Sequence, residues 1–401
     1  MKNTLIIANF ISIMPWQGGN NRFTYLANLL AERGHKVEVI TSSFSHAKKC
    51  QKELEKDKVE ALPYKLTNIY EPGYKKNVSL KRFYSHHILG KNIKKYLENL
   101  ENKPDIIYCA IPSLSVPKAA AQYAKANNIR FVIDIQDLWP EAFKMVFHIP
   151  VISNIIFYPL KKMADSIYKT ADDIIAVSET YVNRAVKIND KYKNKLSVFL
   201  GTELSDFDRY KNENKVEFND DNIRLVYIGT LGHSYDLRCT IDAISILNSK
   251  GIKNIKFVVM GDGPLKSEFE DYARGKNVDV EFLGRLEYAK MVGILCSCDI
   301  AINPISKGAA QSIINKVGDY AAAGLPVIST QECDEYRNLV EKYKIGFNCE
   351  NNNSNDLAEK INILYNNEKI RKEFGNNNRK LAEEKFDRNK TYNEIVKLME
   401  K

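Results

Sequence analysis

Lys316 and Asp319 are the two side chains whose types and spacing first suggest ligand chemistry. They lie three residues apart in NKVGDYAAAGLPVIS, residues 315–329. The alanine run predicts a closely packed helix, Gly324 its C-cap and Pro326 its end, and a buried parallel strand follows. In an α/β protein, ligands bind where such helices meet the carboxyl ends of strands. A lysine there suits phosphate, and a carboxylate suits ribose hydroxyls.

Glycine-rich loops follow three strands predicted in the same half of the chain. They are GTLGHSYD (229–236), GDGP (261–264) and ISKGAAQSIINK (305–316). Unpaired backbone N–H groups at such turns bind phosphate, and the three loops share one edge of a parallel sheet. The alternative interpretation is that the glycines only end strands and that Asp319 is a surface acid in the first turn of a helix.

The first half of the chain offers candidates of a different kind. Gly18, Gly19 and Asn20 follow the first predicted strand and let a substrate approach the backbone closely. Asp137 and Glu141, in DIQDLWPE, come at the end of another strand. The alternatives are that Asp137 is an N-cap and that Trp139 is a core aromatic residue. In the second half, His233 is either an anion ligand or an ordinary loop histidine.

Strands alternate with helices of ten to fifteen residues on both sides of a polar stretch. The stretch, residues 201–222, has no hydrophobic periodicity and is predicted to be a linker. Such alternation favours parallel βαβ units, hence two doubly wound, Rossmann-like domains facing across a cleft. The predicted boundaries are 1–200 and 223–378, followed by a C-terminal helical segment at 379–401.

Composition narrows the class of protein. The 401 residues include 44% hydrophobic and 27% charged side chains, typical of a globular protein, and a formal net charge of +9 favours an anionic partner. Seven cysteines without metal-ligand spacing indicate reduced thiols. The apolar N-terminus is predicted to be a buried strand rather than a signal peptide, and the longest apolar tract, 145–160, is too short to span a membrane.

Residues 73–100 mix lysine and arginine with aromatic and aliphatic side chains. Such a segment suits an anionic bilayer, where each basic residue contributes about 1 kcal/mol near the surface. The alternative is a solvated helix on a basic protein. The sequence contains no aromatic-basic nucleic-acid module such as the RNP signature, so nucleic acid is not the predicted partner.

Taken together, these motifs resemble the GT-B fold glycosyltransferases that use nucleotide sugars, within the glycosyl transferases group 1 or family 4 type. The resemblance covers nearly the whole chain and is carried by the GG before LANLLAERGHKVEVITSS, by DIQDLWPE, ADDIIAVSE and GDGP, and by NKVGDYAAAGLPVIS. The last block resembles the donor-binding block of the family. DLWPE is similar to enzymes of O-antigen and capsule synthesis, and SSFSHAKK with GTLGHSYDL is similar to N-acetylfucosaminyl transferases.

The residue types, together with this resemblance, give expected roles to individual residues of this sequence. For the nucleotide-sugar donor these are Gly229, Thr230, Gly232, Gly261, Gly263, Arg285, Gln311, Ser312, Lys316 and Asp319. The acceptor would meet Gly18, Gly19 and Asn20, and the candidates for catalysis are Asp137, Glu141 and His233. We expect Asp319 to hold the ribose, and Lys316, Arg285 and the N–H groups of Gly232 and His233 to meet the phosphates.

The sequence departs from the pattern of that family in two places. Gln311 stands where the first of two acids is expected, and Asp319 replaces the usual glutamate. The arginine and lysine that usually follow the first strand of this domain are missing, since Thr230 and Tyr235 fall near their positions.

The expected function is therefore transfer of a sugar, such as N-acetyl-L-fucosamine, from a UDP-sugar to an undecaprenyl-diphosphate-linked saccharide. The resemblance implies a reaction without a metal and with no cofactor besides the UDP-sugar co-substrate. The reduced cysteines and the basic segment 73–100 favour a cytoplasmic enzyme peripherally associated with the inner face of the membrane. The resemblance also implies that the C-terminal helix crosses back to the N-terminal domain. Most relatives retain the anomeric configuration, whereas inversion would need a general base, for which Asp137 is the candidate. The alternatives are a GT-B-fold nucleotide-sugar epimerase and a non-catalytic nucleotide-binding protein.

Overall fold

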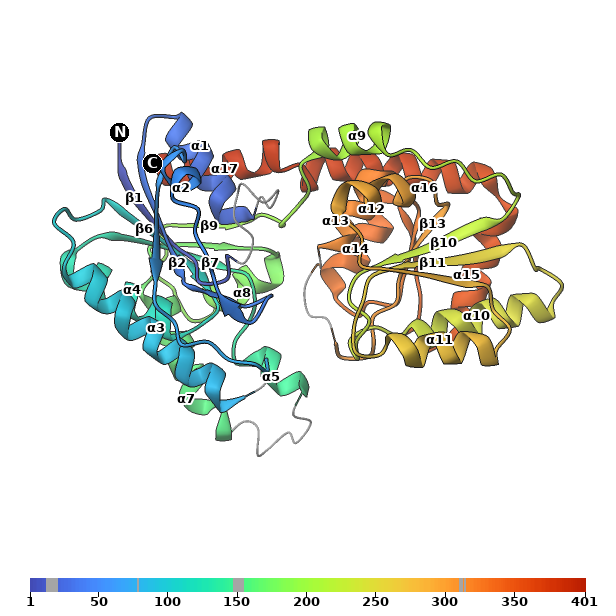
Figure 1. Ribbon diagram of the computed structural model, residues 1–401, viewed down its shortest axis with the longest axis horizontal. Helices are drawn as coiled ribbons and strands as arrows, with labels where there is room; N and C mark the ends of the chain where they lie inside the picture. The colour runs from blue at the N-terminus through green and yellow to red at the C-terminus, as the bar shows by residue number, and fades with distance from the viewer. Residues whose placement is uncertain (12–20, 78, 147–154, 310–312, 314) are drawn as a thin grey trace. The chain divides into compact units, whose positions relative to one another are not determined.

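Two compact units make up the chain in the computed structural model, which describes residues 1–11, 21–77, 79–146, 155–309, 313 and 315–401 (Figure 1). Unit 1 comprises Met1–Val198 together with Tyr392–Lys401, and unit 2 comprises Phe199–Thr391. Each has its own parallel sheet and its own core, and each is described separately below.

Unit 1 is built on a seven-stranded parallel sheet in the order β5-β2-β1-β6-β7-β8-β9. Its strands, with the short β3–β4 hairpin, are β1 (Asn3–Ile7), β2 (Lys36–Ser42), β3 (Phe44–Ser45), β4 (Cys50–Gln51), β5 (Lys65–Ile69), β6 (Ile106–Ile111), β7 (Arg130–Ile135), β8 (Asp173–Ala176) and β9 (Asn194–Ser197). Its helices are α1 (Arg22–Glu32), α2 (Lys56–Glu60), α3 (Leu80–Glu98), α4 (Ser115–Asn127), α5 (Glu141–Val146), α7 (Tyr158–Thr170) and α8 (Glu179–Val186).

One face of this sheet is covered in part by a helix from the far end of the chain. The helix α17 (Arg388–Glu400) packs beside α1, while α3 and α4 cover the other face (Figure 1). Tyr392, Ile395, Val396 and Met399 of α17 are buried in the same core cluster as Leu26 and Leu30 of α1 and Val39 of β2. The apolar stripe of the C-terminal segment therefore completes unit 1, and the expectation that this helix crosses back is confirmed.

Unit 2 has a six-stranded parallel sheet in the order β12-β11-β10-β13-β14-β15. Its strands are β10 (Ile223–Ile228), β11 (Ile255–Met260), β12 (Val280–Gly284), β13 (Ile300–Asn303), β14 (Val327–Ser329) and β15 (Gly346–Asn348). Its helices are α9 (Leu204–Glu213), α10 (Leu237–Ser249), α11 (Lys266–Gly275), α12 (Tyr288–Leu295), α13 (Lys316–Ala323), α14 (Asp334–Tyr343), α15 (Ser354–Asn366) and α16 (Glu368–Leu381), with a π-helical turn at Ala382–Phe386.

The strand order of unit 2 reverses between β10 and β13. Helices α9, α12, α13, α14 and α16 cover one face and α10, α11 and α15 the other (Figure 1). The two neighbours pair only over Leu225↔Ile300 and Val226↔Ala301, so they separate toward their carboxyl ends. This is a topological switch point, where open α/β sheets bind ligands.

The structure confirms the α/β fold class of two Rossmann-like halves and differs from the sequence interpretation in particular elements. The sequence interpretation did not include strands β3, β4, β5, β9 and β15 or helices α2, α5, α7 and α14. The stretch 201–222 contains helix α9, whose Leu204 and Phe207 are buried in the core of unit 2. The stretch is mostly polar, but its two apolar side chains are three positions apart and so lie on the same face of a helix. Burial of these two side chains attaches α9 to the core.

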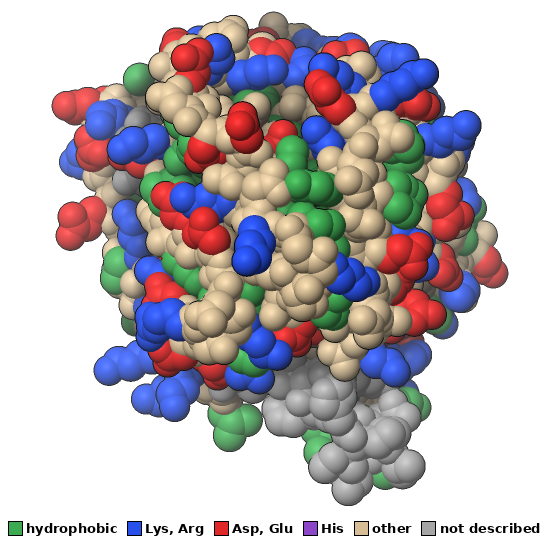
Figure 2. Space-filling view, turned by 90° about the vertical axis from the view of Figure 1, so that its right-hand side faces the viewer, with side chains coloured by type: hydrophobic (Ala, Val, Ile, Leu, Met, Phe, Trp, Pro, Cys, Tyr) green, Lys and Arg blue, Asp and Glu red, His purple; other side chains and the backbone are tan. Residues whose placement is uncertain are grey.

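Charged side chains of both signs are intermingled on the face that Figure 2 presents, and the hydrophobic side chains there form small separate groups. The excess of positive charge is thus not gathered into one basic patch on this face. Within the described residues, no helix combines the length and hydrophobicity needed to cross a bilayer.

Candidate functional site

Two glycine loops lie in contact at the carboxyl edge of the unit 2 sheet. The N–H of Gly229, which follows β10, donates to the Met260 carbonyl at 3.0 Å, and the N–H of Leu231 donates to Asp262 at 2.9 Å. A Cβ on Gly261 would collide with the carbonyl oxygen of Gly229, and a Cβ on Gly263 with that of Leu231. Residues with side chains at these positions would force the loops apart. The structure therefore brings together three of the predicted donor-site glycines.

Lys316 is buried beneath the first of these loops, and none of the described residues gives it a counter-ion. Its side chain extends from the first residue of α13, and its Nζ lies 4.0 Å from the ring centroid of Tyr227 and 3.8 Å from that of Tyr235. The residue is 8% exposed, and its Nζ has no hydrogen-bond partner within the described residues. Burial lowers the pKa of Lys316 well below its ordinary value, since no neighbouring carboxylate offsets the loss of solvation.

Tyr320 holds the two diverging strands of the switch point. Its buried hydroxyl accepts the N–H of Ile228, the last residue of β10, at 3.1 Å and donates to the Ile302 carbonyl of β13 at 3.1 Å. The hydroxyl thus satisfies backbone groups that the separated strands leave unpaired. It also fixes α13, and with it Lys316, relative to the strand ends.

The loops after β10 and β13 are joined above this point. Asp236 donates its N–H to the Pro304 carbonyl at 2.8 Å, and Ser306 donates its N–H to Ser234 at 3.0 Å. By contrast, the N–H groups of Thr230, Gly232 and His233 donate no hydrogen bond to any described residue. Successive backbone N–H groups without protein acceptors are the kind of donors that bind anions such as phosphate.

Asp319, three positions after Lys316, has a different set of neighbours. Its Oδ1 accepts the hydroxyl of Tyr288, at the start of α12, at 2.7 Å and the hydroxyl of Thr202 at 3.0 Å. Burial raises the pKa of Asp319, and the two hydroxyl donors oppose that rise by stabilising the carboxylate. The carboxylate therefore lies near the start of α12, the helix that follows β12. Its Oδ1 already accepts two hydrogen bonds from the protein.

Arg285 directly follows β12 and is exposed. The carbonyl of the preceding Gly284 accepts the Gly261 N–H at 2.8 Å, so the loop of Arg285 adjoins the glycine loops. The remaining predicted donor residues, Gln311 and Ser312, lie outside the described residues.

In unit 1, Asp137 and Glu141 are engaged with neighbours. Asp137 follows β7 and accepts the N–H of Leu138 at 2.9 Å and the indole N–H of Trp139 at 3.3 Å. Burial raises its pKa. Glu141, in the first turn of α5, pairs through Oε1 with Arg184 at 2.6 Å, an arrangement typical of structural ion pairs. The predicted acceptor residues Gly18, Gly19 and Asn20 lie outside the described residues.

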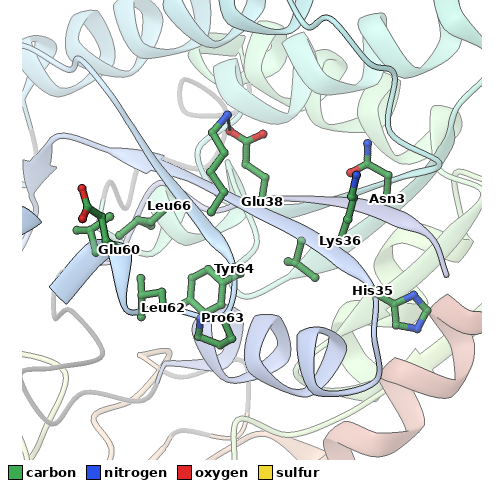
Figure 3. A pocket seen from close by; sticks show the side chains of 12 residues that line it. Asn3, His35, Lys36, Glu38, Glu60, Leu62, Pro63, Tyr64 and Leu66 are labelled. Carbon is green, nitrogen blue, oxygen red and sulfur yellow. Dashed lines mark ion pairs between the residues drawn. The ribbon is translucent and has the colours of Figure 1, made fainter. Parts of the chain in front are cut away.

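A hollow of 610 Å³ lies at the amino end of β1 and β2 in unit 1 (Figure 3). Tyr64, Leu66 and Glu38 line it, and the buried Tyr64 hydroxyl meets no hydrogen-bond partner among the residues that the structure describes. Burial raises the pKa of Tyr64 to about 12. No predicted site residue lies there, and the opposite, carboxyl edge is where ligands of such sheets bind.

Several side chains at the unit 2 site were missed by the sequence interpretation. Tyr227 and Tyr235 enclose Lys316, Tyr288 and Thr202 hold Asp319, and Tyr320 joins the strands. Tyr227 and Tyr320 lie within apolar segments, and their sequence positions therefore indicate core residues. Only their contacts in the structure, with Lys316 and with the ends of β10 and β13, identify them as part of the site. The described residues bring no three His, Cys, Asp or Glu side chains together as a metal site would, and the absence of a metal requirement stays a prediction.

Comparison with known families divides the chain much as the structure does. Residues 208–381 match the family described as Glycosyl transferases group 1, and residues 16–198 match Glycosyltransferase Family 4. Lys316, Asp319 and the glycine loops fall in the first match, and Asp137 and Glu141 in the second.

Similar curated proteins include an uncharacterised glycosyltransferase of Methanocaldococcus jannaschii, 26% identical over 53% of this chain and 55% of that protein. An α-1,4-N-acetyl-D-galactosaminyltransferase of Campylobacter jejuni, named for a saccharide on PP-undecaprenol, is 27% identical over 38% of this chain and 41% of its own length. The capsular polysaccharide biosynthesis glycosyltransferase CapM of Staphylococcus aureus is 24% identical over 71% and 74%. The chain thus spans about half the length of the first two relatives.

Among solved structures, Anabaena HepE in complex with UDP is similar to this chain with a TM-score of 0.69. The identity is 16%, and the alignment covers 99% of both chains. At that identity the likeness concerns the fold, which extends over both units.

Proposed function

We propose, from the premise that this chain is a GT-B glycosyltransferase with a group 1 domain in unit 2, that it transfers a sugar from a UDP-sugar to a lipid-linked saccharide of capsule or O-antigen synthesis. The donor would bind at the carboxyl edge of the unit 2 sheet. We propose an N-acetylated deoxyhexosamine such as N-acetyl-L-fucosamine as the donor sugar, on the strength of the motifs SSFSHAKK and GTLGHSYDL.

The buried, unpaired Nζ of Lys316 is the observation that carries this proposal. A lysine without a counter-ion is costly to bury, so such a group is retained where a ligand supplies the opposite charge. The turn beside it contributes free N–H groups at Gly232 and His233. Together, a cation and N–H donors at a switch point suit the diphosphate of a nucleotide sugar. Asp319 would then hold the ribose.

The reaction we propose needs positioning and charge stabilisation more than a protein nucleophile. The bond between the anomeric carbon and the β-phosphate oxygen breaks, a bond to the acceptor hydroxyl forms on the same face, and the leaving phosphate takes the proton of that hydroxyl. Lys316 and the free N–H groups would stabilise the negative charge that develops on the diphosphate. The acceptor would be held by unit 1 residues in an orientation ready for attack.

We propose that a surface at one end of unit 1 binds the membrane that carries the acceptor. This surface is smaller than the whole segment 73–100 predicted from the sequence. Most of α3 is committed to packing, since Ser85, His86, Leu89, Ile93 and Leu97 are buried. Near the start of the helix two large side chains are exposed to solvent: Leu80 is 86% exposed and Tyr84 62%.

The start of α7 adds to this surface. Ile155 is 71% exposed and Ile156 61%. The ring of Phe143 contacts that of Phe83 in a tilted arrangement and stacks on that of Phe157, which links the start of α3 to that of α7. We call Leu80, Tyr84, Ile155, Ile156 and Tyr158, with the exposed Lys75, Lys76 and Lys81, the membrane patch. Apolar side chains flanked by lysines suit the interface of an anionic bilayer.

The proposed function is tested by UDP release from a panel of UDP-sugars, with and without an undecaprenyl-diphosphate saccharide. We expect release to depend on the acceptor, and NMR of the product to give the anomeric linkage. An epimerase would convert the UDP-sugar without any acceptor, and a binding protein would release no UDP from it.

A further inference from the structure

Cationic and aromatic side chains cluster at the carboxyl edge of the unit 1 sheet. Phe10 follows β1, Tyr74 follows β5 and Trp139 follows β7. The β3–β4 hairpin contributes His46 and Lys49, and α3 contributes Arg82 and His86. We call these seven residues the basic-aromatic cluster.

Three aromatic rings hold the guanidinium of Arg82. Its central carbon lies 4.7 Å from the ring centroid of Trp139, 5.6 Å from that of Tyr74 and 5.8 Å from that of Phe10. Nη1 donates to the Asn77 carbonyl at 3.0 Å, whereas the buried Nε has no hydrogen-bond partner within the described residues. Rings at these distances fix the orientation of a cation but do not neutralise its charge.

Asp137 and Glu71 attract Arg82 at longer range and oppose the lowering of its pKa by burial, but among the described residues neither forms an ion pair with Arg82 or Lys49. Glu71 accepts the hydroxyls of Ser42 at 2.5 Å and Ser85 at 2.7 Å, and Asp137 accepts neutral N–H donors. Lys49 contacts the Tyr74 ring at 4.8 Å and the side-chain oxygen of Asn77 at 2.5 Å. Within the described residues, neither Arg82 nor Lys49 therefore has an ion-pair partner.

The two histidines of the cluster are buried close to these cations. Burial, with the positive charges of Lys49 and Arg82, lowers the pKa of His46 to about 4. Burial and Arg82 lower the pKa of His86 to about 3. His86 is 2% exposed, and neither ring nitrogen has a hydrogen-bond partner in the part of the chain that is described. Its Nε2 is 3.9 Å from Glu71 Oε1, beyond hydrogen-bond distance.

We propose that the basic-aromatic cluster binds an anionic group of the acceptor, a phosphate or a carboxylate, with Arg82 and Lys49 as its charged ligands. The proposal rests on the proposed function, because it assigns the cluster to the acceptor rather than the donor. An anion there would make the direct, charge-assisted hydrogen bonds that Glu71 and Asp137, which act on Arg82 only at longer range, do not make. Phosphate would come from a diphosphate link to lipid, and carboxylate from an acidic sugar.

The test is calorimetric titration of the full chain, saturated with UDP so that the unit 2 site is occupied. Inorganic pyrophosphate is the phosphate probe, and methyl glucuronide is the carboxylate probe. The variants are Arg82→Gln and Lys49→Gln, and the matched control is Lys91→Gln, which removes the same charge from an exposed position on the same helix. The titrations are repeated without UDP in a Lys316→Met background, in which the unit 2 site is disabled. The cluster is then measured independently of UDP binding. If UDP fails to bind the wild type, that result counts against the proposed function and not against the cluster.

We expect at least one probe to bind the wild type, and Arg82→Gln to raise its dissociation constant by about 10- to 100-fold, as for a lost hydrogen bond to a charged group. Lys49→Gln should have a smaller effect in the same direction, and Lys91→Gln none. Binding of pyrophosphate alone would identify a diphosphate link, and binding of the glucuronide alone an acidic sugar.

Two results would overturn the proposal: neither probe binds, or both cluster variants bind as tightly as Lys91→Gln. Thermal unfolding and UDP affinity report whether Arg82→Gln is folded. If it is not, Lys49→Gln decides, because Lys49 is only partly buried.

Discussion

Lys316 and Gly229 are in direct contact at the carboxyl edge of the unit 2 sheet. A Cβ on Gly229 would stand 2.8 Å from the lysine Nζ, and Gly229 has a φ of +138°, which side chains rarely adopt. The lysine therefore reaches the underside of the loop only because position 229 lacks a side chain.

Gly229→Ala should raise the KM for the UDP-sugar by about 10-fold or more, because backbone strain of about 1–3 kcal/mol and the displaced lysine both act on the donor site. Steady-state kinetics measure this. Gly275→Ala is the matched control, since no atom lies within 4 Å of its added Cβ and its φ is not positive. Equal KM values for the two variants would contradict the assignment of Lys316 to the donor.

Lys316→Met should weaken UDP binding by about 10- to 100-fold, the effect of losing a charged hydrogen bond. In the wild type, binding should also depend on pH. Burial holds the pKa of Lys316 low in the free protein, and a bound diphosphate would raise it, so UDP binding takes up a proton between these two values.

It follows that UDP affinity falls as the pH rises through that interval, by up to about tenfold per pH unit. The number of protons taken up on UDP binding is measured by calorimetry in buffers that differ in protonation enthalpy. If Lys316→Met takes up the same number of protons as the wild type, another group is responsible.

Asp319→Ala should raise the KM for the UDP-sugar, since two ribose hydrogen bonds to a carboxylate are worth about 1.5–3 kcal/mol each. Thr202→Val and Tyr288→Phe serve as controls, because each removes a hydroxyl that Asp319 accepts and leaves the carboxylate in place. If the three variants lose thermal stability alike and none changes the KM, Asp319 only ties Thr202 to α12.

The membrane patch should bind anionic liposomes in flotation experiments and release them at 1 M salt, where the Debye length falls to about 3 Å. Changing Lys75, Lys76 and Lys81 together to Glu should abolish flotation. Changing Lys94, Lys95 and Lys103 together, basic residues outside the patch, should not. Flotation that survives both high salt and the first triple change would leave α3 as a solvated basic helix.

The sequence predicted the fold class and most strands because buried parallel strands are continuous apolar runs between glycine-ended helices. It failed at short elements with half-exposed residues: β9, read NKLS, has no apolar run, and α9 has only two buried positions. At the site, the glycine loops and Lys316 were identified because their types are unusual at strand ends. Tyr320 and Tyr227 were not, since a tyrosine within an apolar run looks like core until its hydroxyl or ring meets a partner.

Helix α17 has a consequence for how the protein is made. Unit 1 takes its core residues Tyr392, Ile395, Val396 and Met399 from a segment that is synthesised after all of unit 2. During translation, residues 1–198 therefore leave the ribosome before α17 exists. The apolar side chains that α17 covers stay exposed while unit 2 is translated and folds. Until α17 has been synthesised and packs beside α1, that apolar face is available to chaperones.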